Sequence, residues 1–270
     1  MQQVTLARRA YFSAGRRLWH PGWSEERNRE AFGKLASPHG HDYVLDVFYG
    51  GGIDDDNGMI VNITELKPVI AQAVQQLAGR FLDCEVDYFS TRRPTVENIV
   101  NFLWSQLPQH MGTGYLTRLC LQETNRVWVN KTKDAMQVTR SYEFAAAHRL
   151  HAPQLSAEQN QELYDKCNNL YGHGHNYGLE VTVRGEPDTE TGSIIPFAEL
   201  DRIVEAEVFE HYDHKHLNED CPEFTAIIPT SENLARVIFD RLQTRLQEAG
   251  YQLSKIGLHE TQKNYFEVEA

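Results

Sequence analysis

The sequence contains few cysteines, no long apolar run and less positive than negative charge. Its four cysteines lie far apart and form no Cys-x-x-Cys pair, which excludes a dense disulfide framework. No apolar run approaches the roughly 18–20 residues of a membrane helix, and the N-terminal MQQVTLARRAYF lacks a signal-peptide core, so we expect a cytoplasmic protein without a membrane partner. With 26 Lys and Arg against 38 Asp and Glu, the net charge is −12, and nucleic acid is not expected as a partner.

An internal repeat decides the domain organisation. The 270 residues would suit one large domain or two small ones. Landmarks recur in the same order about 130–137 residues apart, which predicts two homologous domains, residues 1–134 and 135–270. The paired landmarks are His39-Gly40-His41 with His173-Gly174-His175, Gly58-Met59-Ile60 with Gly192-Ser193-Ile194, Pro94-Thr95-Val96-Glu97-Asn98 with Pro229-Thr230-Ser231-Glu232-Asn233, and Gln122-Glu123-Thr124 with His259-Glu260-Thr261.

Each copy shows the element order β-β-α-α-β-β. This order predicts an α+β fold, an antiparallel sheet with two helices on one face. Unpaired sheet edges then favour lateral closure into a larger ring. In the second copy we expect strands at 138–144, 176–184, 252–259 and 264–269, a helix near 197–209, and a helix after Pro229 capped by Thr230 or Ser231.

Three histidines of the second copy form a candidate metal site. His173 and His175 are two residues apart, so they share one face of an extended segment. His148 ends the preceding predicted strand, and its imidazole converges with the other two if the strands pair. Three neutral imidazoles with an open fourth position are typical of catalytic zinc. The alternative is that the His-x-His pair is ordinary polar surface.

Other polar residues of this copy have two interpretations each. Cys167 precedes His173 by six residues and is either a small buried side chain or an activated thiolate. Asp213 and His214 form a carboxylate–imidazole pair suited to proton transfer, or solvated loop residues. Glu260 ends an apolar strand, where it either accepts two N–H donors of an aminopyrimidine ring or protects a sheet edge.

The order of these motifs is specific. The second half contains F-x-A-x-H-R-L, C-N-N-x-x-G-H-G-H-N-Y, D-H-K-x-L-N, P-T-x-E-N and a late H-E-T. This set resembles the 6-pyruvoyl tetrahydropterin synthase family and covers essentially the whole second half. The resemblance implies T-fold units that assemble into a toroidal barrel, usually stacked head to head, with sites built from neighbouring units.

The resemblance also implies roles for individual residues. It places a zinc ion on His148, His173 and His175, and makes Cys167 the catalytic thiolate. Further implied roles are proton transfer by Asp213 and His214, and pterin binding by Glu260 and Thr230.

The implied reaction is that of a carbon–oxygen lyase. It converts 7,8-dihydroneopterin triphosphate to 6-pyruvoyl tetrahydropterin with loss of triphosphate. The related 6-carboxytetrahydropterin synthase, on the path to queuosine, uses the same substrate and ligands but releases acetaldehyde as well. Members of that group typically have a shorter gap between Cys and H-G-H, so the loop after Cys167 favours the pyruvoyl product. A non-catalytic pterin-binding scaffold is the third alternative.

The first half departs from the pattern at its chemical positions. Arg16 stands where the second half has His148, and a guanidinium does not bind zinc. Gly33 takes the place of the cysteine, and Cys84 takes the place of His214. The first domain is therefore expected to be catalytically inactive and to supply half of the ring. Three chains then give the six units of an ordinary family member, a homotrimer built as a pseudo-hexamer.

Overall fold

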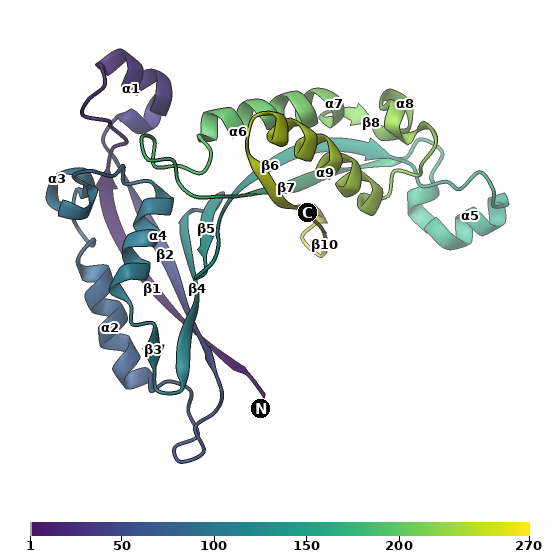
Figure 1. Ribbon diagram of the computed structural model, residues 1–270. Coiled ribbons are helices and arrows are strands. Elements are labelled where there is room, and N and C mark those ends of the chain that lie inside the picture. The colour runs from purple at the N-terminus through teal and green to yellow at the C-terminus, as the bar shows by residue number, and fades with distance from the viewer. Residues whose placement is uncertain (1) are drawn as a thin grey trace. The chain divides into compact units, whose positions relative to one another are not determined.

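The computed structural model describes residues 2–270, which divide into two units (Figure 1). The first unit contains the chain up to Thr139 together with the later segment Arg184–Ala198. The second unit contains Arg140–Val183 and Glu199–Ala270. Within residues 2–270, no helix has the length and apolar character required to cross a bilayer.

The first unit is an antiparallel sheet with helices on one face. Strand β2 pairs on one side with β1 and on the other with β4, which in turn pairs with β3 and β5. Helix α2 packs on β1, and α4 packs on β4 and β5. The strands are β1 (Val4–Arg16), β2 (His39–Gly51), β3 (His110–Met111), β4 (Gly114–Thr124) and β5 (Val127–Lys131), and the helices are α1 (Glu25–Phe32), α2 (Ile63–Gln75), α3 (Leu82–Glu85) and α4 (Val96–Gln106).

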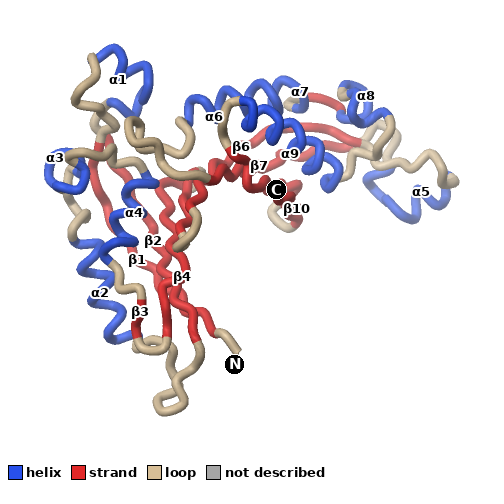
Figure 2. The backbone as a smooth tube through the Cα atoms, in the orientation of Figure 1, coloured by secondary structure: helices blue, strands red, loops and turns tan. Residues whose placement is uncertain are grey.

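The second unit repeats this arrangement. Its sheet has the order β6-β7-β9-β10, with the short β8 parallel to β6, and Figure 2 shows α6, α7 and α9 along one side of the strands, with α5 beyond the strand ends. The strands are β6 (Met136–His148), β7 (His173–Arg184), β8 (Lys215–His216), β9 (Gln252–Thr261) and β10 (Asn264–Glu269), and the helices are α5 (Ala157–Tyr164), α6 (Phe197–Val204), α7 (Glu210–Tyr212), α8 (Leu217–Asp220) and α9 (Ser231–Glu248). The predicted α+β fold is confirmed.

Side-chain periodicity explains the core of the second unit. Alternate residues of β7, from Tyr177 to Val183, are fully buried, because every second side chain faces the helices. On α9 the buried residues Leu234, Ile238 and Leu242 follow one another at intervals of four. Thr230 caps this helix by accepting a 3.3 Å hydrogen bond from Asn233 N.

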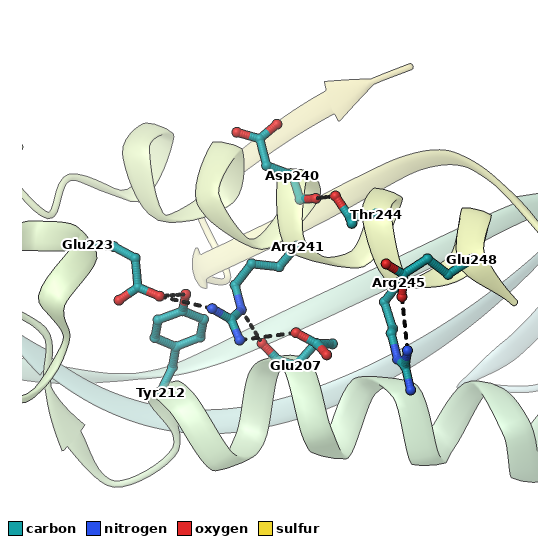
Figure 3. A network of polar contacts seen from close by, with 8 residues as sticks. All are labelled: Glu207, Tyr212, Glu223, Asp240, Arg241, Thr244, Arg245 and Glu248. Carbon is teal, nitrogen blue, oxygen red and sulfur yellow. Dashed lines mark hydrogen bonds and ion pairs between the residues drawn. The ribbon is translucent and has the colours of Figure 1, made fainter.

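A polar network fixes α9 over the preceding helices (Figure 3). Arg241 of α9 donates to the Glu207 carbonyl and carboxylate at 3.0 Å each, and to the Glu223 carboxylate at 3.1 Å. The hydroxyl of Tyr212 donates to the same Glu223 carboxylate at 3.1 Å. Since Glu207 lies in the π-helical stretch Glu205–Phe209 that extends α6, this network ties α9 to the end of α6.

The loop between β6 and β7 contains a helix that hydrophobic periodicity did not predict. Helix α5 is short and mostly exposed, so it lacks the apolar stripe that marks a core-facing helix. A capping box between Ser156 and Gln159 begins it, and the 3₁₀ turn Asp165–Asn168 follows it. The turn carries Cys167 to the end of β6.

Candidate metal and substrate site

The ends of β6 and β7 bring three imidazoles together. His148 is the last residue of β6, and His173 and His175 lie at the start of β7. One ligand atom from each lies within 4.8 Å of the others. His148 is fully buried, whereas the other two are partly exposed. The cluster thus has one closed side and one side that a ligand can reach.

The hydrogen bonds of these imidazoles leave three nitrogens free. Nδ1 of His148 donates to the Pro229 carbonyl at 2.8 Å, which leaves Nε2 with its lone pair. In the described chain, Nε2 of His148, Nδ1 of His173 and Nε2 of His175 are buried without a hydrogen-bond partner. Burial lowers the pKa of His148 and of His173, which favours the neutral form that metal coordination requires. The donor set therefore fits a zinc ion.

Glu260 of β9 lies beside this cluster. Its Oε1 is 3.9 Å from His175 Nε2 and accepts a 2.6 Å hydrogen bond from Ser231 Oγ. Its Oε2 accepts from Asn264 Nδ2 at 2.9 Å. Burial opposes ionisation, but these hydrogen bonds and the nearby imidazoles outweigh it and lower the pKa of Glu260. Glu260 is therefore an ionised acceptor at neutral pH, held in place by Ser231 and Asn264.

Ser231 is a site residue that sequence reasoning missed. The sequence predicts either Thr230 or Ser231 as the cap of α9; Thr230 is the cap, and Ser231 is buried and donates to Glu260. Its position inside the P-T-x-E-N motif was the available indication. Thr230 itself lines a cavity of about 710 Å³ together with Arg149, His151 and Leu170.

Cys167 is held near the end of β6 by backbone contacts. Its carbonyl accepts from Leu150 N at 2.8 Å, and Arg149 Nε donates to the next residue's carbonyl at 3.2 Å. Burial raises the pKa of the Cys167 thiol, and the carboxylates of Glu260 and Asp165 raise it further. The described side chains thus favour the thiol over the thiolate.

Asp213 and His214 form a pair of their own. Asp213 Oδ1 accepts from Ala145 N at 2.8 Å, and its Oδ2 lies 3.0 Å from His214 Nδ1. His214 adopts a positive φ of 56° and leaves 82% of its side chain exposed. Within residues 2–270, neither residue has a hydrogen bond or ion pair to Cys167 or to the three histidines.

The equivalent position in the first unit contains an ion pair. The side chain of Arg16 is 2% exposed, and its guanidinium Nη2 donates to the Glu123 carboxylate. Its Nη1 donates to the Pro94 carbonyl at 2.6 Å, as His148 Nδ1 does to Pro229. His41 Nε2 lies 3.5 Å from Glu123. A fixed cation thus lies between a proline carbonyl and a glutamate that are equivalent to those beside the imidazole cluster in the second unit.

Comparison with known proteins assigns the family. The family model described as 6-pyruvoyl tetrahydropterin synthase matches residues 5–134 and 137–270, and the chain belongs to this family. The 6-pyruvoyl tetrahydrobiopterin synthase of Poecilia reticulata is 45% identical over 128 residues, which are 47% of this chain and 85% of the relative. The 6-carboxy-5,6,7,8-tetrahydropterin synthase of Aquifex aeolicus is 27% identical over 137 residues, 42% of this chain and 83% of the relative. The structure of the Caenorhabditis elegans 6-pyruvoyl tetrahydropterin synthase aligns with a TM-score of 0.48 at 36% identity, over 50% of this chain and 96% of that one.

Proposed function

We propose that the second unit is a zinc-dependent lyase that converts 7,8-dihydroneopterin triphosphate to 6-pyruvoyl tetrahydropterin and triphosphate. The observation that carries the proposal is the juxtaposition of three imidazole nitrogens that lack a hydrogen-bond partner with the ionised carboxylate of Glu260. The 45% identity to a 6-pyruvoyl tetrahydrobiopterin synthase supports the choice of reaction.

In this proposal His148, His173 and His175 hold the zinc ion. A zinc ion in such a site polarises substrate oxygens and acidifies neighbouring protons. His148 is oriented by its bond to the Pro229 carbonyl, which fixes the tautomer with a free Nε2.

Glu260 orients the substrate by accepting N–H donors of the aminopyrimidine ring. Each carboxylate oxygen has lone pairs beyond the bond it accepts from Ser231 or Asn264. The ionised state of Glu260 makes it an acceptor at neutral pH. Thr230, on the adjoining cavity wall, is the second proposed contact to the pterin.

Cys167, Asp213 and His214 are proposed to move the side-chain protons as triphosphate leaves and the product tautomerises. Asp213 is ionised, because its hydrogen bonds from Ala145 and His214 outweigh burial and lower its pKa. His214 is exposed and makes no described contact with Cys167. We therefore assign the Asp213–His214 pair to a site completed by another chain, within the proposed trimer of two-unit chains.

The experiment is incubation of the zinc-loaded full chain with 7,8-dihydroneopterin triphosphate and identification of products by mass spectrometry. Release of triphosphate with 6-pyruvoyl tetrahydropterin supports the proposal, whereas acetaldehyde assigns the chain to the 6-carboxytetrahydropterin synthases. Absence of turnover with tight pterin binding would indicate a scaffold. His173→Ala should abolish turnover, and the matched control His39→Ala, at the same motif position of the first unit, should retain it.

A further inference from the structure

Both copies contain a turn of the same construction between their second strand and the next helix. In the first copy Gly58 N donates to the Asp54 carbonyl at 2.8 Å and Asp54 N to the Met59 carbonyl at 3.0 Å. In the second copy Gly192 and Ser193 make the same two bonds with Asp188, at 2.8 and 3.0 Å. The glycines have φ values of 73° and 79°. The two turns therefore present the same backbone groups to a partner.

The second turn is docked on the P-T-V-E-N motif within the first unit. Thr95 Oγ1 donates to the Gly192 carbonyl at 2.6 Å, and Ile194 N donates to the Glu97 carboxylate at 3.1 Å. The fit is tight, because a Cβ on Gly192 would lie 2.8 Å from Asn98 Nδ2. The motif thus forms the surface that receives this turn.

The corresponding groups of the other two elements have no partner among the described residues. The carbonyl of Gly58 and the N–H of Ile60, which match those of Gly192 and Ile194, make no hydrogen bond there. The exposed Glu232, which matches Glu97, makes none either. A Cβ on Gly58 would meet nothing within 4 Å. The turn of the first copy is therefore free to dock, and the P-T-S-E-N motif of the second copy is free to receive a turn.

Cavity size and apolar exposure agree with this pairing. The cavity beside Thr95, which Ser193 and Phe197 of the docked segment help to line, measures about 50 Å³, whereas the cavity beside Thr230 measures about 710 Å³. Ile63, which matches Phe197, is 44% exposed. Leu170, on the wall of the large cavity, is 68% exposed. Each free surface therefore carries an apolar side chain that the other can cover.

We propose that the turn Asp54–Ile60 and Ile63 of one chain dock on Pro229–Asn233 of a second copy. In this junction the Gly58 carbonyl accepts from Thr230, and the Ile60 N–H donates to Glu232. The inference rests on the proposed assembly of several chains and does not depend on the proposed reaction. The junction is head-to-tail, and a ring of chains is the closed form of such a contact. It also covers the cavity next to the Pro229 carbonyl that orients His148.

The test measures the mass of the full chain by sedimentation velocity and light scattering at micromolar concentration. The variant that alters the docking turn's side of the junction is Ile63→Glu. Helix α2 tolerates the charge because an acidic residue is favoured in the first turn of a helix. The variant that alters the receiving motif is Glu232→Ala. Each should weaken association at least about tenfold. The matched control Gln72→Glu adds the same charge about 13 Å further along the exposed side of α2 and should keep the wild-type mass.

Mixing the two variants tests the head-to-tail geometry. The Ile63→Glu chain keeps an intact receiving motif, and the Glu232→Ala chain keeps an intact docking turn. An equimolar mixture should therefore form a complex heavier than either variant alone. Wild-type mass in both variants, or a mixture no heavier than its components, would overturn the junction while leaving the assembly intact. A wild-type chain that stays at 31.0 kDa would overturn both. Turnover is assayed separately, so neither outcome is confused with failure of the proposed reaction.

Discussion

Arg16→Ala removes a buried cation from the first unit and leaves its anionic partner behind. Arg16 is 1% exposed and Glu123 is 6% exposed, so the variant leaves a buried carboxylate without its cationic partner. Removal of one partner from a buried ion pair costs about 3–5 kcal/mol. The Pro94 carbonyl also loses its 2.6 Å donor. We therefore expect the free energy of unfolding of the first unit to fall by about 3–5 kcal/mol.

The assay is urea denaturation followed by circular dichroism, with the neighbouring residue as matched control. Arg17 forms an ion pair with Asp83 at 3.0 Å but is 39% exposed, so Arg17→Ala should cost less than about 1 kcal/mol. The double variant Arg16→Met with Glu123→Gln should recover part of the loss, because position 123 then carries no unpaired charge. Zinc content should stay at one per chain in all of these variants. A loss for Arg16→Ala no larger than that for Arg17→Ala would refute the reasoning.

Three further outcomes are expected. His148→Ala should reduce the zinc content measured by elemental analysis from one per chain to none; a retained ion contradicts the assigned ligand set. Cys167→Ala should keep its zinc but lose about 10²–10⁴-fold in turnover, and a loss below tenfold in a steady-state assay would return Cys167 to a structural role. Burial raises the pKa of Glu97 from 4.5 to about 7, so the folded state binds its proton more tightly than the unfolded state. The contribution of Glu97 to the stability of the first unit should therefore be largest below pH 4.5 and fall by about 3 kcal/mol as the pH rises through 7; Glu97→Gln should remove this contribution from the pH dependence of the melting temperature, and the same pH dependence in both proteins would contradict the assignment.

Residue spacing was sufficient to predict the sheet and the grouping of the three imidazoles. His173 and His175 share a face because strand side chains alternate with period two, and β6 places His148 beside them. The same alternation explains why the strands of the α+β fold were located. The landmarks of the repeat predicted the element order of one unit from the other.

Contacts between residues distant in sequence were not predictable in this way. The bond from Ser231 to Glu260 spans 29 residues, and it depends on how α9 is rotated over β9. The docking of Gly192 on Thr95 spans 97 residues and depends on the path of the segment after β7. Helix α5 was missed because its residues form no apolar stripe. Periodicity describes one element at a time, whereas these features arise between elements.

The ion pair of the first unit has a consequence for how the chain responds to metal supply. A zinc ion exchanges with the surrounding solution, whereas the guanidinium of Arg16 is part of the polypeptide and remains beside Glu123 under all conditions. The first unit therefore neutralises its buried carboxylate without drawing on a metal pool. If the second unit binds zinc as proposed, we expect a chelator to remove the ion from the second unit and to leave the ion pair of the first unit in place. On these two proposals, we expect the first unit to fold, and its turn Asp54–Ile60 to be available to a neighbouring chain, without a metal ion.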